Sequence, residues 1–143
     1  NVVDAACGSR FYNFEKTKDG GTTWTEVNGD PFDQNMGVAE GLLFFTNDFG
    51  FAGLTYASED FSMLYVTKDG GETFERLELP VTELPSEAAE LGFTIEDYDY
   101  HTMPQIVDGK MEIYLQTDAM EQQGIIFQSE DNGVTWEYAG CKE

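Results

Sequence analysis

Short apolar runs separated by turn-forming residues recur along the chain, and this pattern predicts strands. In the middle of the chain four such runs follow one another: GLLFFTN (41–47), GFAGLTYA (50–57), SMLYVTKD (62–69) and TFERLEL (73–79). The run GLLFF has no polar residue, as expected of a strand that is covered on both faces. Together these runs predict one complete unit of four antiparallel strands.

A second unit is predicted toward the C-terminus. KMEIYLQTD (110–118) alternates apolar and polar residues, which is typical of a half-buried strand, and GIIFQSED (124–131) and TWEYAG (135–140) follow it. The N-terminal segments form only part of such a unit: NVVDAAC (1–7), RFYNFEKTKD (10–19) and TTWTEV (22–27). With 143 residues the chain is long enough to bury a sizeable core, and we expect a single domain, 1–143.

One eight-residue pattern occurs three times, as TKDGGTTW (17–24), TKDGGETF (67–74) and SEDNGVTW (129–136). All three copies fit Ser/Thr-x-Asp-x-Gly-x-Thr-Trp/Phe, and their aspartates lie 50 and 62 residues apart. A repeat of this length indicates one supersecondary unit per copy. The matching positions are Thr17, Asp19, Gly21, Thr23, Trp24, Thr67, Asp69, Gly71, Thr73, Phe74, Ser129, Asp131, Gly133, Thr135 and Trp136.

Each copy is predicted to form a hairpin turn. Its aspartate accepts hydrogen bonds from backbone N–H groups across the turn. Its glycines, and Asn132 in the third copy, supply positive φ values. Its final aromatic residue opens the next strand and packs beneath the turn. Because every residue has a structural role, the pattern needs no catalytic explanation.

The pattern resembles the Asp box, or bacterial neuraminidase repeat (BNR), found in sialidases, sortilin-type receptors, photosystem II assembly factors and some xyloglucan-degrading enzymes. The resemblance implies an all-β fold of β-propeller-like blades, each with four antiparallel strands. In those families the box links the third and fourth strands of a blade, on the face away from the active site. Counting strands gives about two and a half to three blades, whereas closed propellers have at least about four. We therefore expect a homodimer, missing blades or free strand edges.

One segment departs from the strand pattern. PSEAAEL (85–91) contains a possible N-cap at Ser86 and several helix formers, and Gly92 follows as a stop signal. We expect one short helix near 86–91, inserted at the surface between two blades. The insertion accounts for the longer of the two spacings between the repeats.

The charge of the chain limits its partners. Seven basic and 28 acidic residues give a formal charge of −21, which repels phosphate backbones and anionic lipids. We therefore expect no nucleic-acid partner and no membrane insertion, and the most apolar stretch is interrupted at Asn47 and Asp48. A cationic partner, a calcium ion, an unknown protein, a neutral glycan or no ligand at all stays open, because acidity also serves solubility.

The residues that enzymes with this repeat require are missing. Sialidases that the chain resembles hold a sugar carboxylate with three arginines, whereas this sequence has only Arg10 and Arg76, so the pattern excludes sialidase activity by this chain alone. His101 is the only histidine, and neither a Gly-x-Ser-x-Gly motif nor a phosphate-binding loop is present. The 28 acidic residues form too many pairs to identify a glycosidase pair.

These observations favour a non-enzymatic binding or assembly module, without a catalytic residue, metal site or cofactor. We expect it to be extracytoplasmic or secreted, with its signal peptide outside this chain. The alternative is a fragment of a secreted glycoside hydrolase that lacks its catalytic arginines.

Two cysteines, Cys7 and Cys141, flank the first and the last box. Because a propeller-like fold brings its two termini together, we expect a Cys7–Cys141 disulfide. Such a bond would also place the protein outside the reducing cytosol.

The longest connection without a box is LGFTIEDYDYHTM (91–103), which mixes aromatic and acidic residues. Aromatic faces suit sugars or a peptide, and carboxylates suit hydroxyl groups or a loosely held calcium ion. The alternative is that the aromatic residues anchor this segment to the core and that its acids are only solvated. The candidate ligand surface consists of Phe93, Asp97, Tyr98, Asp99, Tyr100 and His101.

Overall fold

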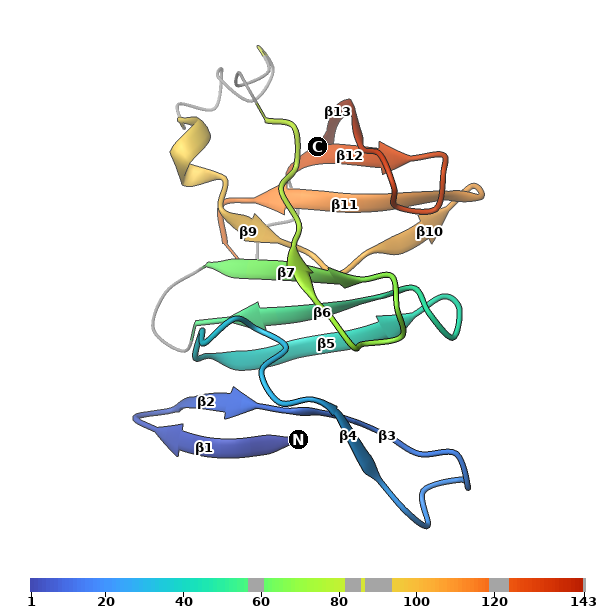
Figure 1. Cartoon of the computed structure of the whole chain (residues 1–143). Coiled ribbons are helices and arrows are strands. Elements are labelled where there is room, and N and C mark those ends of the chain that lie inside the picture. The colour runs from blue at the N-terminus through green and yellow to red at the C-terminus, as the bar shows by residue number, and fades with distance from the viewer. Residues whose placement is uncertain (57–60, 82–85, 87–93, 119–123, 143) are drawn as a thin grey trace. The chain divides into compact units, whose positions relative to one another are not determined.

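The computed structural model describes residues 1–56, 61–81, 86, 94–118 and 124–142, and this part of the chain is all-β (Figure 1). The predicted all-β class is thereby confirmed. The chain divides into two compact units: unit 1 comprises Asn1–Glu59 and Met63–Leu77, and unit 2 comprises Asp60–Ser62 and Glu78–Glu143. Among the described residues, none of the sheets closes on itself.

Unit 1 begins with two small antiparallel sheets. In the first, β1 (Val2–Ala6) pairs with β2 (Ser9–Tyr12), and in the second, β3 (Phe14–Lys16) pairs with β4 (Thr25–Asn28). These strands correspond to the partial unit that the N-terminal segments predicted.

A four-stranded sheet follows with the order β5-β6-β7-β8. Its strands match the four apolar runs predicted for the middle of the chain: β5 (Val38–Phe44), β6 (Gly50–Thr55), β7 (Ser62–Thr67) and β8 (Glu75–Arg76). In β6 and β7 consecutive residues are buried, so both faces of these two strands are covered. Fully buried Phe51, Leu54 and Leu64 form the centre of this core.

The sequence assigned full burial to the wrong strand. All but the last residue of the run GLLFF lies in β5, which is at the edge of the four-stranded sheet, and its Leu42 is 55% exposed. An uninterrupted apolar run indicates burial only when other parts of the structure cover both faces of the strand, and the exposure of Leu42 shows that one face of β5 is not fully covered.

Unit 2 contains a single sheet built around β11 (Lys110–Gln116). On one side β11 pairs with β12 (Gly124–Ser129), and β12 pairs with β13 (Glu137–Lys142) across a register shift between Ile126 and Phe127. On its other side β11 pairs with both β9 (Tyr100–His101) and β10 (Gln105–Val107). A 3-10 turn, η1 (Ile95–Asp97), precedes β9.

The buried apolar face predicted for residues 110–118 is confirmed in β11, but the half-buried strand is not, because Glu112 and Gln116 on the other face are buried too. Met111, Ile113 and Leu115 are buried, as expected for its apolar face. Glu112, at an intervening position, is also only 5% exposed. This carboxylate is tolerated because both of its oxygens accept hydrogen bonds, from Tyr114 and Gln128.

Two further expectations concern the helix and the cysteines. The helix predicted near 86–91 lies outside the described residues, apart from Ser86. The predicted Cys7–Cys141 disulfide is wrong, because both cysteines are free. It assumed that a closed ring brings the two termini together, whereas Cys7 lies in the turn between β1 and β2 in unit 1, Cys141 lies in β13 of unit 2, and no described sheet is closed.

In the described part of the chain no helix has the length and apolar character needed to cross a bilayer.

Candidate functional site

The first copy of the repeat, turn 1 (residues 17–24), is closed by a hydrogen-bonded pair of side chains. The Thr17 hydroxyl donates to Asp19 Oδ1 at 2.8 Å and accepts a hydrogen bond from the N–H of Gly21 at 2.9 Å. Asp19 in turn accepts from the backbone N–H of Thr23 at 2.8 Å and from its hydroxyl at 2.6 Å. The carboxylate therefore ties both ends of the turn together.

The same four hydrogen bonds recur in turn 2 (67–74) and turn 3 (129–136). The two bonds of the leading hydroxyl measure 2.8 and 2.8 Å in turn 2, and 2.8 and 2.7 Å in turn 3. The two bonds from the threonine to the aspartate measure 2.9 and 2.5 Å in turn 2, and 2.8 and 2.6 Å in turn 3. The predicted positive φ values are confirmed at both central residues of every turn.

These hydrogen bonds stabilise the charged form of each aspartate. The threonine hydroxyl is the largest cause, followed by the threonine N–H, and the pKa of Asp19, of Asp69 and of Asp131 falls from 3.8 to about 2. A carboxylate with so low a pKa is a poor general acid or base near neutral pH. The repeated chemistry of the chain is therefore structural.

The aromatic residue that ends each turn has a different environment in each copy. Trp24 is 60% exposed and donates its indole N–H to the carbonyl of Gly21 at 3.2 Å. Phe74 packs edge-on against Phe14 at 5.5 Å between ring centroids, and Trp136 is only 8% exposed. Burial of this position is therefore not a property of the turn itself.

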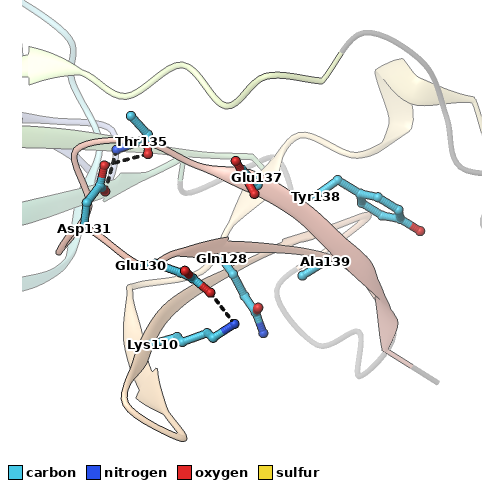
Figure 2. A pocket seen from close by; sticks show the side chains of 8 residues that line it. All are labelled: Lys110, Gln128, Glu130, Asp131, Thr135, Glu137, Tyr138 and Ala139. Atoms are coloured by element: carbon cyan, nitrogen blue, oxygen red, sulfur yellow. Dashed lines mark hydrogen bonds and ion pairs between the residues drawn. The ribbon is translucent and has the colours of Figure 1, made fainter.

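A pocket of about 440 Å³ lies beside turn 3, within unit 2 (Figure 2). We call it the hairpin pocket, because strands β12 and β13 and the turn between them form most of its wall. Its size is typical of ligand sites, which measure roughly 300–1,000 Å³. The residues that line it are Lys110, Gln128, Glu130, Asp131, Thr135, Glu137, Tyr138 and Ala139.

Strand register explains why polar side chains gather here. Directly opposed residues of neighbouring strands share one face of a sheet. Gln105 opposes Glu112, Glu112 opposes Gln128, and Gln128 opposes Glu137. We call these four residues the polar row; it crosses the sheet from β10 to β13, and its β12 and β13 members reach the hairpin pocket.

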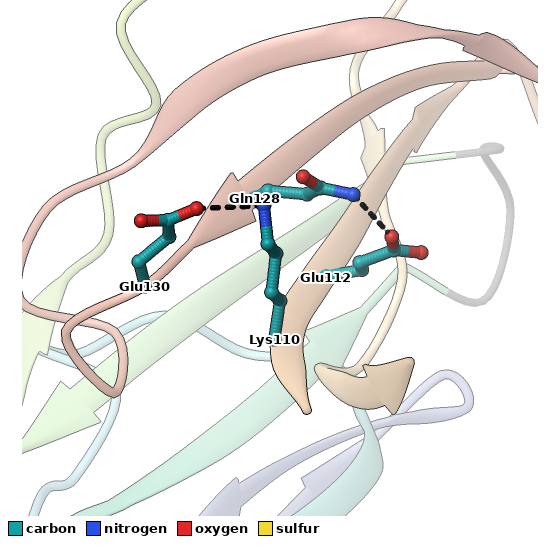
Figure 3. Close-up of polar contacts among 4 residues, drawn as sticks. All are labelled: Lys110, Glu112, Gln128 and Glu130. Carbon is teal, nitrogen blue, oxygen red and sulfur yellow. Dashed lines mark hydrogen bonds and ion pairs between the residues drawn. The ribbon is translucent and has the colours of Figure 1, made fainter. Parts of the chain in front are cut away.

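One cation lies among the carboxylates of this site. Lys110 Nζ is 2.6 Å from Glu130 Oε1 (Figure 3). The pKa of Lys110 is raised, first by the hydrogen bond to Glu130 and by its charge, and further by the charges of Glu112 and Glu137. Lys110 lowers the pKa of Glu130 in return. The local potential is therefore negative even beside the lysine.

The Gln128 amide has a fixed orientation. Its Nε2 donates to Glu112 Oε1 at 2.6 Å (Figure 3). The other Glu112 oxygen accepts from the Tyr114 hydroxyl at 2.9 Å. Since an amide nitrogen, and not an amide oxygen, must face a carboxylate, Gln128 Oε1 points elsewhere as an acceptor. Exposed Glu137 has no hydrogen bond or ion pair among the described residues.

The candidate ligand surface predicted from the sequence lies elsewhere in unit 2 and is largely committed to local contacts. Asp97 Oδ2 accepts hydrogen bonds from the N–H of Thr94 at 2.6 Å and from its hydroxyl at 2.9 Å, and these bonds lower the pKa of Asp97. Tyr98 is buried, and Asp99 accepts a backbone hydrogen bond from Ser62 at 3.3 Å. Phe93 lies outside the described residues.

The remaining two members of that surface are part of the sheet. Tyr100 and His101 form β9, which pairs with β11. The N–H of His101 donates to Ser62 Oγ at 2.6 Å, and the ring Nδ1 of His101 is 3.1 Å from the carbonyl oxygen of Ser62. A ligand role for this segment stays a prediction.

The calcium ion left open by the sequence gains no support from this segment. Within the ranges that the structure describes, no group of three or more histidine, cysteine, aspartate or glutamate side chains is arranged to hold a metal ion.

Sequence reasoning missed the hairpin pocket entirely. Lys110, Gln128 and Glu137 are individually ordinary polar positions of strands, and Glu130 follows a strand in turn 3. They meet only once the register of three strands is known. The one available signal was the alternation of polar residues in 110–118 and 124–131, because it predicts a polar face for each strand.

The chain matches no protein-family model, no curated protein and no solved structure.

Proposed function

We propose that this chain is a non-enzymatic binding or assembly module built from Asp-box repeats of the β-propeller class, and that its ligand site is the hairpin pocket. One observation carries this proposal: the same four hydrogen bonds close all three turns and occupy both oxygens of each aspartate. The repeated residues thus serve as scaffold, and function falls to the surfaces that differ between the repeats.

The hairpin pocket is the surface that fits this role best. Most of its side chains stand on paired strands, which hold a binding site more precisely than loops do. Glu137 and Gln128 Oε1 also offer acceptors that, in the described part of the chain, are not used for packing or for closing a turn. The segment around Asp97–His101, in contrast, uses many of its polar groups locally.

The proposal includes the expected location and assembly. By the resemblance to Asp-box proteins, the module works outside the cytoplasm. The described sheets are open, so a second copy of the chain or further blades would complete a propeller.

Ligand titration of isotope-labelled protein tests the function. Peptides and neutral oligosaccharides are added in turn, and the backbone amide signals of Lys110, Gln128 and Glu137 are followed. We expect one class to shift these signals and to leave the signals of turn 1 unchanged, and we expect no hydrolysis of fluorogenic glycosides. Turnover of a glycoside that is lost on replacing one carboxylate of this chain would overturn the proposal.

A further inference from the structure

We propose that the hairpin pocket binds the guanidinium or ammonium group of a basic peptide segment, beside the resident ammonium of Lys110. This inference rests on the proposed function and names the ligand class of the same site. It is carried by the groups that the pocket presents and by the charge of the unit around it.

The free groups of the pocket are acceptors. Gln128 Oε1 is directed away from Glu112 because Nε2 faces that carboxylate, and Glu137 has no hydrogen-bond or ion-pair partner within the described part. Glu130 uses one oxygen for Lys110 and keeps the other. A guanidinium has five N–H donors and no acceptor, so it complements such a lining better than a carboxylate, a phosphate or a second amide does.

The charge balance points the same way. Among the lining residues, Glu130, Asp131 and Glu137 are negatively charged and Lys110 is the single cation, which leaves a formal charge of −2 at the site. Unit 2 as a whole has two basic and 16 acidic residues, a formal charge of −14. Such a field attracts cationic segments and accelerates their association, whereas it gives a neutral glycan no advantage.

Asp131 and Thr135 also line the pocket but are not offered to a ligand. Both oxygens of Asp131 accept hydrogen bonds from the residues of turn 3, and the Thr135 hydroxyl is one of the donors. The binding groups are therefore Gln128, Glu130 and Glu137, and turn 3 fixes the wall on which they stand (Figure 2).

The test uses a hexapeptide of alternating glycine and arginine and the same peptide with citrulline in place of arginine, which removes the charge and keeps the shape. Binding is measured by calorimetry and by the amide signals of the pocket, at about 50 mM and about 500 mM salt. We expect the arginine peptide to bind, the citrulline peptide to bind at least several-fold more weakly, and high salt to weaken the arginine complex, since exposed charges are screened.

Two substitutions that change the charge of the hairpin pocket in opposite directions test whether the arginine peptide binds there. Glu137→Gln is expected to weaken the arginine peptide about 2- to 5-fold, and Lys110→Gln to strengthen it by a similar factor, because exposed ion pairs contribute modestly. Glu96→Gln and Lys68→Gln are the matched controls: they change the net charge equally, at exposed positions outside the pocket. We expect both controls to have smaller effects.

The outcomes separate the two proposals. Equal effects of Glu137→Gln and Glu96→Gln, or equal binding of both peptides, would overturn the cationic ligand. If a neutral oligosaccharide bound instead and shifted the pocket signals, the binding module would stand and only the ligand class would be wrong. If no peptide and no oligosaccharide shifted those signals, both proposals would be wrong.

Discussion

The two units share one kind of turn but differ in what their sheets present to the surroundings. In unit 1, strands β6 and β7 are buried on both faces. In unit 2, the sheet buries Ile113 and Phe127 on one face, and its other face carries the polar row, in which Glu112 is buried and Gln105 and Glu137 are exposed. Turns 1, 2 and 3 have the same hydrogen bonds in both units, so the turn specifies the hairpin and not the surface beside it.

Charge follows the same division. Unit 1 has five basic and 12 acidic residues, a formal charge of −7, and unit 2 has two basic and 16 acidic residues, a formal charge of −14. If acidity served solubility alone, it would not need to be concentrated in one unit. The difference favours a role for the charge of unit 2 in recognition.

The largest expected effect tests the claim that β6 belongs to a core and β5 to an edge. Leu54→Ala removes a fully buried side chain of β6, and we expect the free energy of unfolding to fall by about 2–5 kcal/mol. Leu42→Ala, in neighbouring β5, removes a side chain that is 55% exposed and should cost less than about 1 kcal/mol. Urea unfolding followed by tryptophan fluorescence measures both. Equal losses would contradict the burial assigned to the two strands.

A pair of glycines separates the turn from its surroundings. Gly21 and Gly71 hold equivalent positions in turns 1 and 2, and both have φ of +92°. Alanine at either site therefore meets the same left-handed strain, about 1–2 kcal/mol. At Gly71 the new Cβ would also overlap the buried ring of Phe14, whereas at Gly21 its nearest contact is an ordinary 3.8 Å to Trp24.

We expect Gly71→Ala to lower the free energy of unfolding by about 1–3 kcal/mol more than Gly21→Ala does, because overpacking adds to the backbone strain. Thermal unfolding of the two variants under identical conditions gives the difference. A larger loss for Gly21→Ala would show that the environments of turns 1 and 2 are wrongly described.

A smaller effect compares the leading hydroxyl of two turns. Thr67→Val deprives the buried N–H of Gly71 of its acceptor, and we expect the free energy of unfolding to fall by about 1–3 kcal/mol. Thr17→Val makes the same change in turn 1, where Gly21 is exposed and water can replace the hydroxyl, so the loss should be below about 1 kcal/mol. Denaturant midpoints of both variants test this, and equal losses would contradict it.

The last effect appears only in acid. The pKa of Asp19, of Asp69 and of Asp131 is lowered to about 2 in the folded chain, from an ordinary value of 3.8. Their contribution to stability is therefore complete above about pH 4 and is lost as the pH falls through about 2. Carboxyl-carbon titration by NMR should give midpoints near pH 2. Thr135→Val should raise the pKa of Asp131, because the hydrogen bond from the Thr135 hydroxyl is the largest cause of the lowering of that pKa. The pKa of Asp19 should stay unchanged.

The sequence predicted most of the local structure because strands and turns depend on neighbouring residues. Apolar runs located β5, β6 and β7, and the repeat located three turns together with their donors, acceptors and positive φ values. Properties that depend on distant partners were not predictable in the same way. The predicted burial of GLLFF was wrong because the residues of a single strand do not determine where in a sheet that strand lies.

The same limit applies to the candidate site. The row Glu112–Gln128–Glu137 exists only through two pairings across hairpins, and one of them passes a register shift that the sequence does not reveal. The predicted disulfide was wrong for a related reason, since it inferred contact between chain ends from an assumed closed ring. The aromatic and acidic residues of 93–101 were predicted as a site because they are contiguous in the sequence, whereas the residues of the hairpin pocket are not.

The register shift between β12 and β13 has one more consequence, for behaviour at high concentration. In the described sheet β13 is an outer strand, and an outer strand offers its backbone to any other chain that can align with it. The irregular step between Ile126 and Phe127, the φ of +127° at Gly140 and the charge of Glu137 all disturb that alignment. The β13 margin of this sheet is thus a poor template for fibril growth.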